Sequence, residues 1–225
     1  MNSNSTTRGS LPQIITNAES LYEGNLRHYF SVLFHTAQNV NHPYHNWRHM
    51  MHVTTMAYFA CQHHNNELRR LQIREILIAA MFHDADHSGL LGQDDLNIER
   101  AVRVFKAHML PEDQPHQNNI VSLMQDTEFP YKVSSDGLLL NARILRDADM
   151  AQVFSLAWMQ QVIFGFASEW RKAPLDVLRL QIPFLDNITF STEWGQTTYP
   201  KKVVEEKIEE VKQLLELLDL KVPSK

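Results

Sequence analysis

Three short segments of the chain carry side chains of the kinds that bind metal ions or transfer protons. Residues 44–49 read Tyr-His-Asn-Trp-Arg-His, so that His45 and His49 lie four apart and share one face of a helix. Residues 83–87 read His-Asp-Ala-Asp-His and directly follow an apolar run. Residues 147–149 read Asp-Ala-Asp and also follow apolar residues. These three segments are the places where the sequence concentrates potential chemistry.

Each segment taken alone has an ordinary structural explanation. Two histidines four apart often lie on a helix surface, and Asp147 or Asp149 could accept the free backbone N–H groups at a helix start. Together they indicate more, because two of the clusters follow apolar segments and would reach the edge of the core. Uncompensated charge is expensive there, and a divalent cation bound by carboxylates and neutral imidazoles would compensate it. The pattern therefore predicts a metal centre.

The elements that must position these residues are helices. Seven glycines in 225 residues are about half the usual share, which favours helices over a turn-rich sheet. Helical periodicity covers residues 10–38, 44–62, 67–82, 96–108, 118–125, 138–170, 174–185 and 201–220. Pro183 is expected to end or kink its helix. We expect one all-α, compact multi-helix domain over 1–225, with a core at about 14–195 and a C-terminal amphipathic helix at about 201–220.

The composition excludes several classes of protein. The 44% hydrophobic and 21% charged residues are typical of a globular domain, and a net charge of −5 argues against binding a nucleic-acid duplex. No apolar run approaches the roughly 20 residues of a membrane helix. A single cysteine, Cys61, cannot form an internal disulfide and fits a reducing compartment. We therefore expect a cytoplasmic protein with a small-molecule substrate and no membrane partner, and the sequence is compatible with a homodimer.

The order of the three clusters resembles the H…HD…D signature of the HD-domain metal-dependent phosphohydrolases, an all-α superfamily. Residues 44–49 and 83–89 are similar to the two metal-site motifs of class I cyclic-nucleotide phosphodiesterases, and residues 97–101 resemble the Asn-x-Glu-x-Ala that follows them. Small bacterial predicted HD phosphohydrolases share a similar start and a Leu-x-Asp-Ala-Asp segment. The resemblance spans about residues 44–193, although the chain is shorter than a full class I catalytic domain. It implies an HD-domain, phosphodiesterase-like bundle.

The resemblance also implies a set of metal ligands. A first ion would be held by His49, His83, Asp84 and Asp149, and Asp84 would bridge to a second, mostly water-coordinated ion. Asp149 is preferred to Asp147 because it falls on the Ala-Asp that superfamily members use. Asp147 would then contact a ligand or cap a helix. The expected cofactors are two divalent metal ions, with Mn, Mg, Zn, Co and Fe all compatible.

By the same resemblance, a water shared by both ions becomes a hydroxide and attacks phosphorus in line. His45 matches the histidine that protonates the leaving oxygen, and Glu99 would orient His45. His87 would hydrogen-bond the bridging water or a phosphate oxygen. The expected activity is hydrolysis of a cyclic nucleotide or a similar small phosphodiester.

Residues for binding the substrate are suggested by the same family. Gln181 and Phe184 resemble a Gln-x-x-Phe in which the glutamine binds a purine edge and the phenylalanine stacks on the ring. Their ordinary explanation is a core phenylalanine beside a surface glutamine. Tyr44 and Asn46 are also predicted to contact substrate, and residues 126–128 are either an active-site loop or a helix-terminal turn.

Three other functions remain open from the sequence. A nucleoside-monophosphate phosphatase would use the same metal site, although His45 favours a diester. A di-iron oxygenase would need two more histidines between Asp84 and Asp149, where the sequence offers only His87, His108 and His116. A degenerate module would keep the fold for binding alone, but every expected metal ligand is present.

Overall fold

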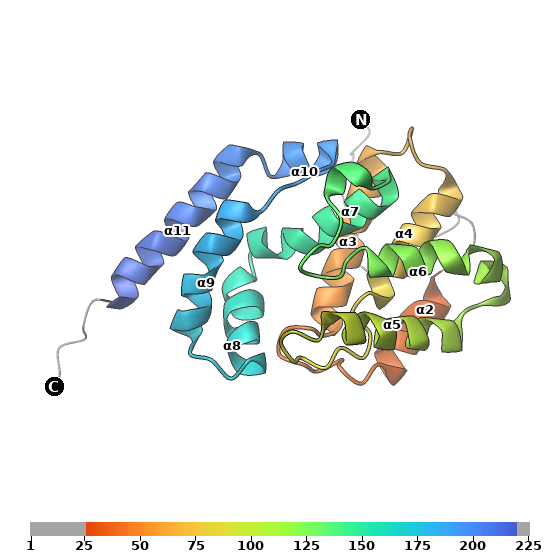
Figure 1. The fold of residues 1–225 in the computed structure, drawn as a ribbon, viewed down its shortest axis with the longest axis horizontal. Helices are drawn as coiled ribbons and strands as arrows, with labels where there is room; N and C mark the ends of the chain where they lie inside the picture. Colours follow the sequence, from red (N-terminus) through yellow and green to blue (C-terminus); the bar gives the residue numbers. More distant parts are fainter. Residues whose placement is uncertain (1–25, 220–225) are drawn as a thin grey trace, which may run out of the picture.

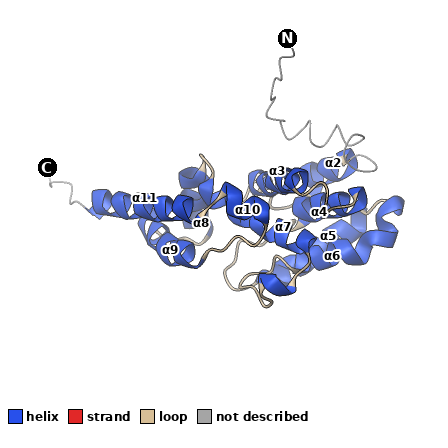
Figure 2. Ribbon diagram, turned by 90° about the horizontal axis from the view of Figure 1, so that it is seen from above, coloured by secondary structure: helices blue, strands red, loops and turns tan. Residues whose placement is uncertain are grey.

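The computed structural model describes residues 26–219, and the described chain is all-helical, with no strand (Figure 2). Its α-helices are α2 (Arg27–Thr36), α3 (Trp47–His63), α4 (Arg70–Phe82), α5 (Asp94–His108), α6 (Gln117–Gln125), α7 (Leu140–Met150), α8 (Gly165–Glu169), α9 (Pro174–Asn187), α10 (Glu193–Thr198) and α11 (Lys201–Asp219). Short 3₁₀ segments cover Pro111–His116, Ser135–Gly137 and Ala151–Phe154, and a π-helical segment covers Met159–Phe164. The all-α prediction is confirmed.

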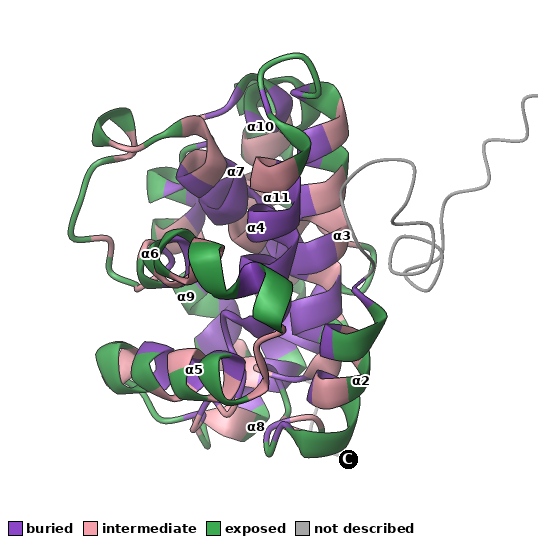
Figure 3. Ribbon diagram, turned by 90° about the vertical axis from the view of Figure 1, so that its right-hand side faces the viewer, coloured by how far each residue is buried: buried purple, intermediate pink, exposed green. Residues whose placement is uncertain are grey.

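The helices form two bundles, each with its own core (Figure 1). The N-terminal bundle contains α2–α7, and its centre is α4, in which every residue of the run 76–82 is fully buried. Figure 3 shows the buried faces of α3, α4 and α7 turned toward one another. The C-terminal bundle contains the segment 159–164, α8, α9 and α11, around Trp158, Val177 and Val211. α10 connects α9 with α11 along the end of the N-terminal bundle.

The helix predicted over 138–170 is broken, which corrects the sequence prediction. α7 ends at Met150, the chain turns after Phe154, and the two halves Leu140–Phe154 and Met159–Glu169 meet at 97°. The apolar periodicity continues through the break because the first half packs into one bundle and the second half into the other. No single helix of the described chain is long and apolar enough to cross a membrane. The bent pair Leu140–Phe154 and Met159–Glu169 meets this criterion by length and composition alone, and only when its two halves are counted as one segment.

Other helix boundaries differ in smaller ways. Pro183 does not end α9, which continues to Asn187. The side-chain amide of Asn187 donates to the carbonyl oxygen of Pro183 in this last turn. The short α10 was not predicted and begins where the Thr192 hydroxyl accepts the N–H of Gly195. Within the predicted helix 10–38 the described part is α2, and residues 10–25 lie outside the described range, as does the start of the predicted core.

Candidate metal centre and active site

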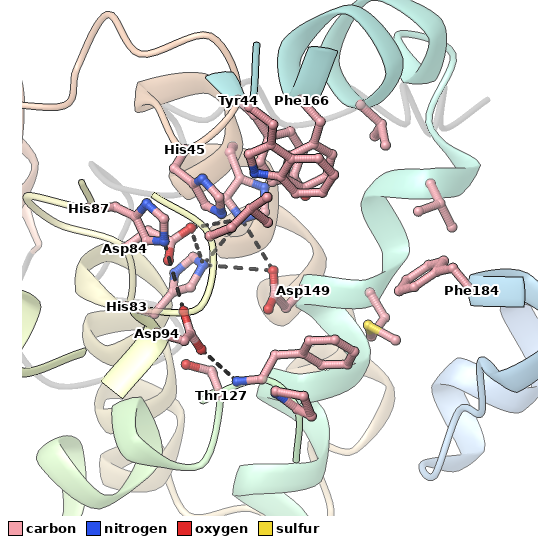
Figure 4. Close-up of a pocket in the computed structure, with 18 of the residues that line it drawn as sticks. Tyr44, His45, His83, Asp84, His87, Asp94, Thr127, Asp149, Phe166 and Phe184 are labelled. Carbon is pink, nitrogen blue, oxygen red and sulfur yellow. Dashed lines mark hydrogen bonds and ion pairs between the residues drawn. The ribbon is translucent and has the colours of Figure 1, made fainter. Parts of the chain in front are cut away.

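Three elements of the N-terminal bundle bring the predicted metal ligands together (Figure 4). His49 lies in the first turn of α3, His83 and Asp84 directly follow α4, and Asp149 lies in the last turn of α7. The Nε2 atom of His49 is 3.1 Å from Asp84 Oδ2 and 3.2 Å from Asp149 Oδ1. The Nε2 atom of His83 is 3.3 Å and 3.7 Å from the same two oxygens. Two imidazole nitrogens and two carboxylate oxygens therefore face a common point.

The other nitrogen of each imidazole has a fixed partner. His49 Nδ1 lies 3.2 Å from the side-chain oxygen of the buried Gln152, and His83 Nδ1 lies 2.8 Å from the carbonyl oxygen of Ala80. An oxygen acceptor requires the hydrogen on Nδ1, so each neutral ring directs the lone pair of Nε2 at the carboxylates. This is the tautomer that a metal ion needs. The sequence does not predict this role of Gln152, because no motif surrounds it.

The charges of the cluster favour the binding of a cation. Burial alone would lower the pKa of His49, but hydrogen bonds to Asp149 and Asp84 outweigh it and raise the pKa to about 10. Burial would raise the pKa of Asp84, but the charge of His83 and other imidazoles holds it well below its usual range. A cluster that retains a proton so strongly has excess negative charge, and a divalent cation would displace that proton. Two imidazoles and two carboxylates are a donor set that suits Zn, Mn, Co or Fe.

The two carboxylates of the segment 147–149 have different surroundings. Asp147 turns away from the cluster and accepts hydrogen bonds from the backbone N–H groups of Ser191 and Thr192, at 3.0 and 2.8 Å to its nearest oxygen, and from the Thr192 hydroxyl at 2.7 Å. A Cβ atom on Gly195 would lie 2.5 Å from Asp147 Oδ2, so this packing requires glycine. Asp147 thus holds the chain that leads into α10. Only Asp149 faces the two histidines.

His45 lies beside this cluster, and a carboxylate from the C-terminal bundle holds it. Glu169, the last residue of α8, accepts a short hydrogen bond from His45 Nδ1, and its second oxygen accepts the N–H groups of Tyr44 and His45 at 2.9 and 3.1 Å. Burial would raise the pKa of Glu169, but the hydrogen bond with His45 outweighs it and lowers the pKa to about 2. Glu169 is therefore an anion wherever the protein is folded near neutrality.

The prediction that Glu99 orients His45 is wrong. The Glu99 side chain is 67% exposed on the outer face of α5, where its nearest cation is Arg103 at 3.9 Å. Glu169 makes the predicted contact with His45 instead, although it lies 124 residues after His45 in the chain. No sequence motif surrounds Glu169, so only the packing of the two bundles reveals it.

His87 is buried and stacks on His45, with ring centroids 3.5 Å apart and planes inclined by 19°. Its Nδ1 accepts the N–H of Gly89 at 2.9 Å, and its Nε2 lies 2.9 Å from the side-chain amide of Asn97 and 3.8 Å from Asp94 Oδ1. Both ring nitrogens of His87 therefore have partners within the protein. His45, His87 and Glu169 bring three ligand-type atoms close together. The lone pairs of an imidazole lie in the ring plane, so two nearly parallel stacked rings do not direct them at one ion. This second cluster is suited to holding a proton rather than a metal.

Asn46 has a structural role, which corrects its prediction as a substrate-binding residue. It is 4% exposed, and its side-chain oxygen caps α3 by accepting the N–H groups of Arg48 and His49. Its amide donates to the carbonyl oxygens of His42 and Pro43. The polar atoms of the Asn46 side chain are all paired, and Asn46 does not line the cavity. It therefore fixes the start of α3 and, through it, the position of His49.

A cavity of about 470 Å³ opens over the cluster, between the two bundles. Its walls are mainly apolar and aromatic, and Tyr44 stacks on Phe166 there at a centroid distance of 3.6 Å. Gln181 and Phe184, both predicted to bind substrate, lie on the wall that α9 provides. Thr127 also lines the cavity, so the segment 126–128 contributes to the site. No lysine or arginine of the described chain is among the lining residues.

The two further histidines considered for a second iron lie elsewhere. Neither His108 nor His116 lines the cavity. His116 contacts Glu75 at 3.3 Å, and the carbonyl oxygen of His108 contacts the ring of His28 at 2.7 Å. Of the three histidines that the sequence offers between Asp84 and Asp149, only His87 lines the cavity, whereas the oxygenase alternative needs two.

An all-α bundle that gathers two histidines and two aspartates beneath a cavity has the architecture of the HD-type metal-dependent phosphohydrolases. The sequence profile of the family described as 3'5'-cyclic nucleotide phosphodiesterase matches residues 44–156, and the chain belongs to this family. It is accordingly a metal-dependent phosphoric diester hydrolase.

One solved structure supports the fold independently. The phosphodiesterase domain of the rhodopsin phosphodiesterase from Salpingoeca rosetta superposes with a TM-score of 0.68 at 16% sequence identity. The match covers 92% of this chain and 86% of that domain, and therefore includes most of the C-terminal bundle. None of the curated proteins matches the chain.

Proposed function

We propose that the protein hydrolyses a 3′,5′-cyclic nucleotide or a similar small phosphodiester at the cavity between its bundles. The observation that carries this proposal is the convergence of His49 and His83 Nε2 on the carboxylates of Asp84 and Asp149, at 3.1–3.7 Å. These four residues would hold the first of two divalent ions, and Asp84 would be shared with the second. When bound, the ions would supply an acidified water and neutralise charge on the phosphate oxygens.

His45 is the general acid in this proposal. Glu169 fixes its Nδ1, so the opposite nitrogen, Nε2, is free to carry the proton that the leaving oxygen needs. Burial lowers the pKa of His45, while the charge of Asp84 and the hydrogen bond to Glu169 oppose that effect. The imidazolium is thus poised to lose its proton to an alkoxide. After the transfer, the neutral ring keeps its Nδ1 hydrogen on Glu169. His87 stacks on His45 and would hold that ring in place, because its own nitrogens contact Gly89 and Asn97 rather than a water or a phosphate oxygen.

The walls of the cavity favour a substrate with a single negative charge. A phosphomonoester or a polyphosphate carries at least one more charge than a diester, and no lysine or arginine lines the cavity to neutralise it. A planar, largely apolar base fits walls made of Phe166, Leu180 and Phe184. Gln181 would bind the edge of that base, held by contacts of 3.5 Å with Trp158 Nε1 and with the Val177 carbonyl oxygen.

A hydrolysis screen tests this proposal. The purified protein is assayed with Mn²⁺, Mg²⁺, Co²⁺ or Zn²⁺ against cyclic AMP, cyclic GMP, the nucleoside monophosphates and bis(4-nitrophenyl) phosphate. We expect turnover of the cyclic nucleotides and loss of all turnover with a chelator. Turnover of monoesters alone would overturn the diester assignment.

His45→Ala is the matched variant in the same screen. We expect it to retain metal, because His45 is not one of the four proposed ligands, and to lose turnover of the cyclic esters by about 10²-fold. Full activity of His45→Ala on a cyclic nucleotide would contradict its role as general acid.

A further inference from the structure

Asn39 lies in the loop between α2 and α3 and is completely buried although it is polar. Its side-chain amide donates two hydrogen bonds of 2.7 Å, one to the carbonyl oxygen of His45 and one to that of Asp84. Its side-chain oxygen accepts the N–H of Asp86 at 2.8 Å. One side chain therefore connects the segment that carries the general acid with the segment that carries the shared metal ligand.

A second contact connects the same two segments. The carboxylate of Asp86 accepts the N–H of Gln38 at 2.7 Å. Asp86 adopts a φ of 60°, in the left-handed region that aspartate tolerates better than most residues. Residues 38–39 and the turn at 84–86 are therefore joined by hydrogen bonds, and each segment donates to the other. Neither Asn39 nor Asp86 lines the cavity, so neither contacts the substrate directly.

We propose that Asn39 is a positioning residue that fixes the proton donor His45 relative to Asp84; this inference rests on the proposed function. The phosphate would be held at Asp84 and its ion, and the leaving oxygen must at the same time lie within reach of His45 Nε2. Proton transfer depends steeply on that geometry, because a misplacement of about 1 Å can cost about 100-fold in rate. The side-chain amide of Asn39 holds the backbone at both ends of this distance, at His45 and at Asp84. Aspartate could not replace it, because a carboxylate has no N–H to donate to two carbonyl oxygens.

Substrates with different leaving groups distinguish a loss of His45 positioning from a loss of protein stability. A cyclic nucleotide expels an alkoxide, which needs a proton, whereas bis(4-nitrophenyl) phosphate expels a nitrophenolate that leaves without one. For Asn39→Ala at saturating Mn²⁺, we expect kcat for cyclic AMP or cyclic GMP to fall about 10- to 100-fold. We expect kcat for the nitrophenyl ester to fall less than about 3-fold, and KM for both to stay within about 3-fold. A loss that is equal for the two esters would overturn the proposal.

Two further variants keep this test decisive. Asn39→Ser retains one hydrogen-bond donor. It is used in place of Asn39→Ala if the alanine variant does not unfold cooperatively. We expect the same selective loss of kcat for the cyclic nucleotide. Asp113→Asn is the matched control, because it weakens a buried ion pair with Arg74 that does not line the cavity. We expect Asp113→Asn to lower the melting temperature without changing the ratio of the two kcat values. A change of that ratio in Asp113→Asn would mean that destabilisation alone explains the effect.

A double-mutant cycle tests whether Asn39 acts through His45. If it does, Asn39→Ala combined with His45→Ala hydrolyses the cyclic ester no more slowly than His45→Ala alone. Full additivity of the two losses would contradict the inference. If His45→Ala itself shows no dependence on the leaving group, the proposed general acid fails instead. The two failures are therefore distinguishable.

Discussion

The two bundles make different contributions to the same cavity. The N-terminal bundle contains the four candidate ligands and His45, and the family match over 44–156 lies almost entirely within it. The C-terminal bundle provides Phe166, Gln181 and Phe184 on the opposite wall, beyond the matched residues. In the proposed function, the N-terminal bundle would therefore determine the reaction, and the C-terminal bundle would determine which substrates fit the cavity.

Glu169 is the exception to this separation. It belongs to the C-terminal bundle, yet it accepts the hydrogen bond of His45 in the N-terminal bundle. Two glycines allow this contact. A Cβ atom on Gly89, where φ is +74°, would lie 2.8 Å from Glu169 Cγ, and one on Gly165 would lie 2.9 Å from the Pro43 carbonyl oxygen. The bundles therefore meet closely at His45, the proposed proton donor.

The largest expected effect comes from Asp84→Ala in the N-terminal bundle. The variant removes the carboxylate that both ions would share under the proposed function, so we expect loss of bound metal and a fall in kcat of at least about 10³-fold. Metal content and turnover are measured on the same samples, with Asp95→Ala, an exposed acid on α5, as the control. A variant that keeps its metal and a tenth of its activity would show that the chemistry lies elsewhere.

We also expect the N-terminal bundle to lose stability at acidic pH through one of its histidines. All twelve histidines precede residue 117. One of them, His52 on α3, is half-buried, and its buried Nε2 has no hydrogen-bond partner. Burial, aided by the charge of His49, lowers the pKa of His52 to about 4 from a usual value near 6.5. The unfolded chain therefore binds this proton more readily. Stability should fall as the pH drops from about 6.5 to about 4, by up to about 3 kcal/mol.

Chemical denaturation of the wild type and His52→Gln between pH 4 and pH 8, with a chelator present throughout, measures this difference. The variant should lose less stability than the wild type across that interval. Parallel pH curves for the two proteins would show that His52 is not the group responsible.

A smaller effect is expected where the two bundles meet. Glu169→Gln removes the anion that stabilises protonated His45, so we expect kcat for a cyclic nucleotide to fall about 30-fold while metal content is retained. Hydrolysis of bis(4-nitrophenyl) phosphate should change much less. If Glu169→Gln lost its metal, or lost both activities equally, the separation between ligand cluster and proton donor would be wrong.

The smallest effect is expected on the wall of the C-terminal bundle. Phe184→Ala removes an aromatic face from the cavity, so we expect KM for cyclic AMP or cyclic GMP to rise about 5- to 10-fold with kcat nearly unchanged. Leu217→Ala, on an exposed position of α11, is the control. An effect on kcat larger than that on KM would assign Phe184 to the chemistry rather than to binding.

The sequence predicted the N-terminal bundle better than the C-terminal one, for physical reasons. His49, His83, Asp84 and Asp149 lie in short local motifs, and helix periodicity places each of them at a helix end. Periodicity does not distinguish one long helix over 138–170 from two that enter different cores, because the apolar residues continue through the turn.

The errors within the site have a common cause. Asn46 has the residue type of both a ligand-binding amide and a helix cap, and only its four hydrogen bonds identify it as a cap. Glu99 is suggested by the resemblance of residues 97–101 to a family motif, whereas Glu169 reaches His45 through tertiary packing. Asn39 was not identified for the same reason: its partners His45 and Asp84 come together only in the folded chain.

The most direct test of this account is to locate the bound cation. Crystals grown with Zn²⁺, with data collected at the zinc absorption edge, would show each ion as an anomalous peak. The account predicts the strongest peak among His49, His83, Asp84 and Asp149, with His45, His87 and Glu169 free of metal. A strongest peak on the stacked His45–His87 pair and Glu169, or no peak at the four predicted ligands, would contradict it.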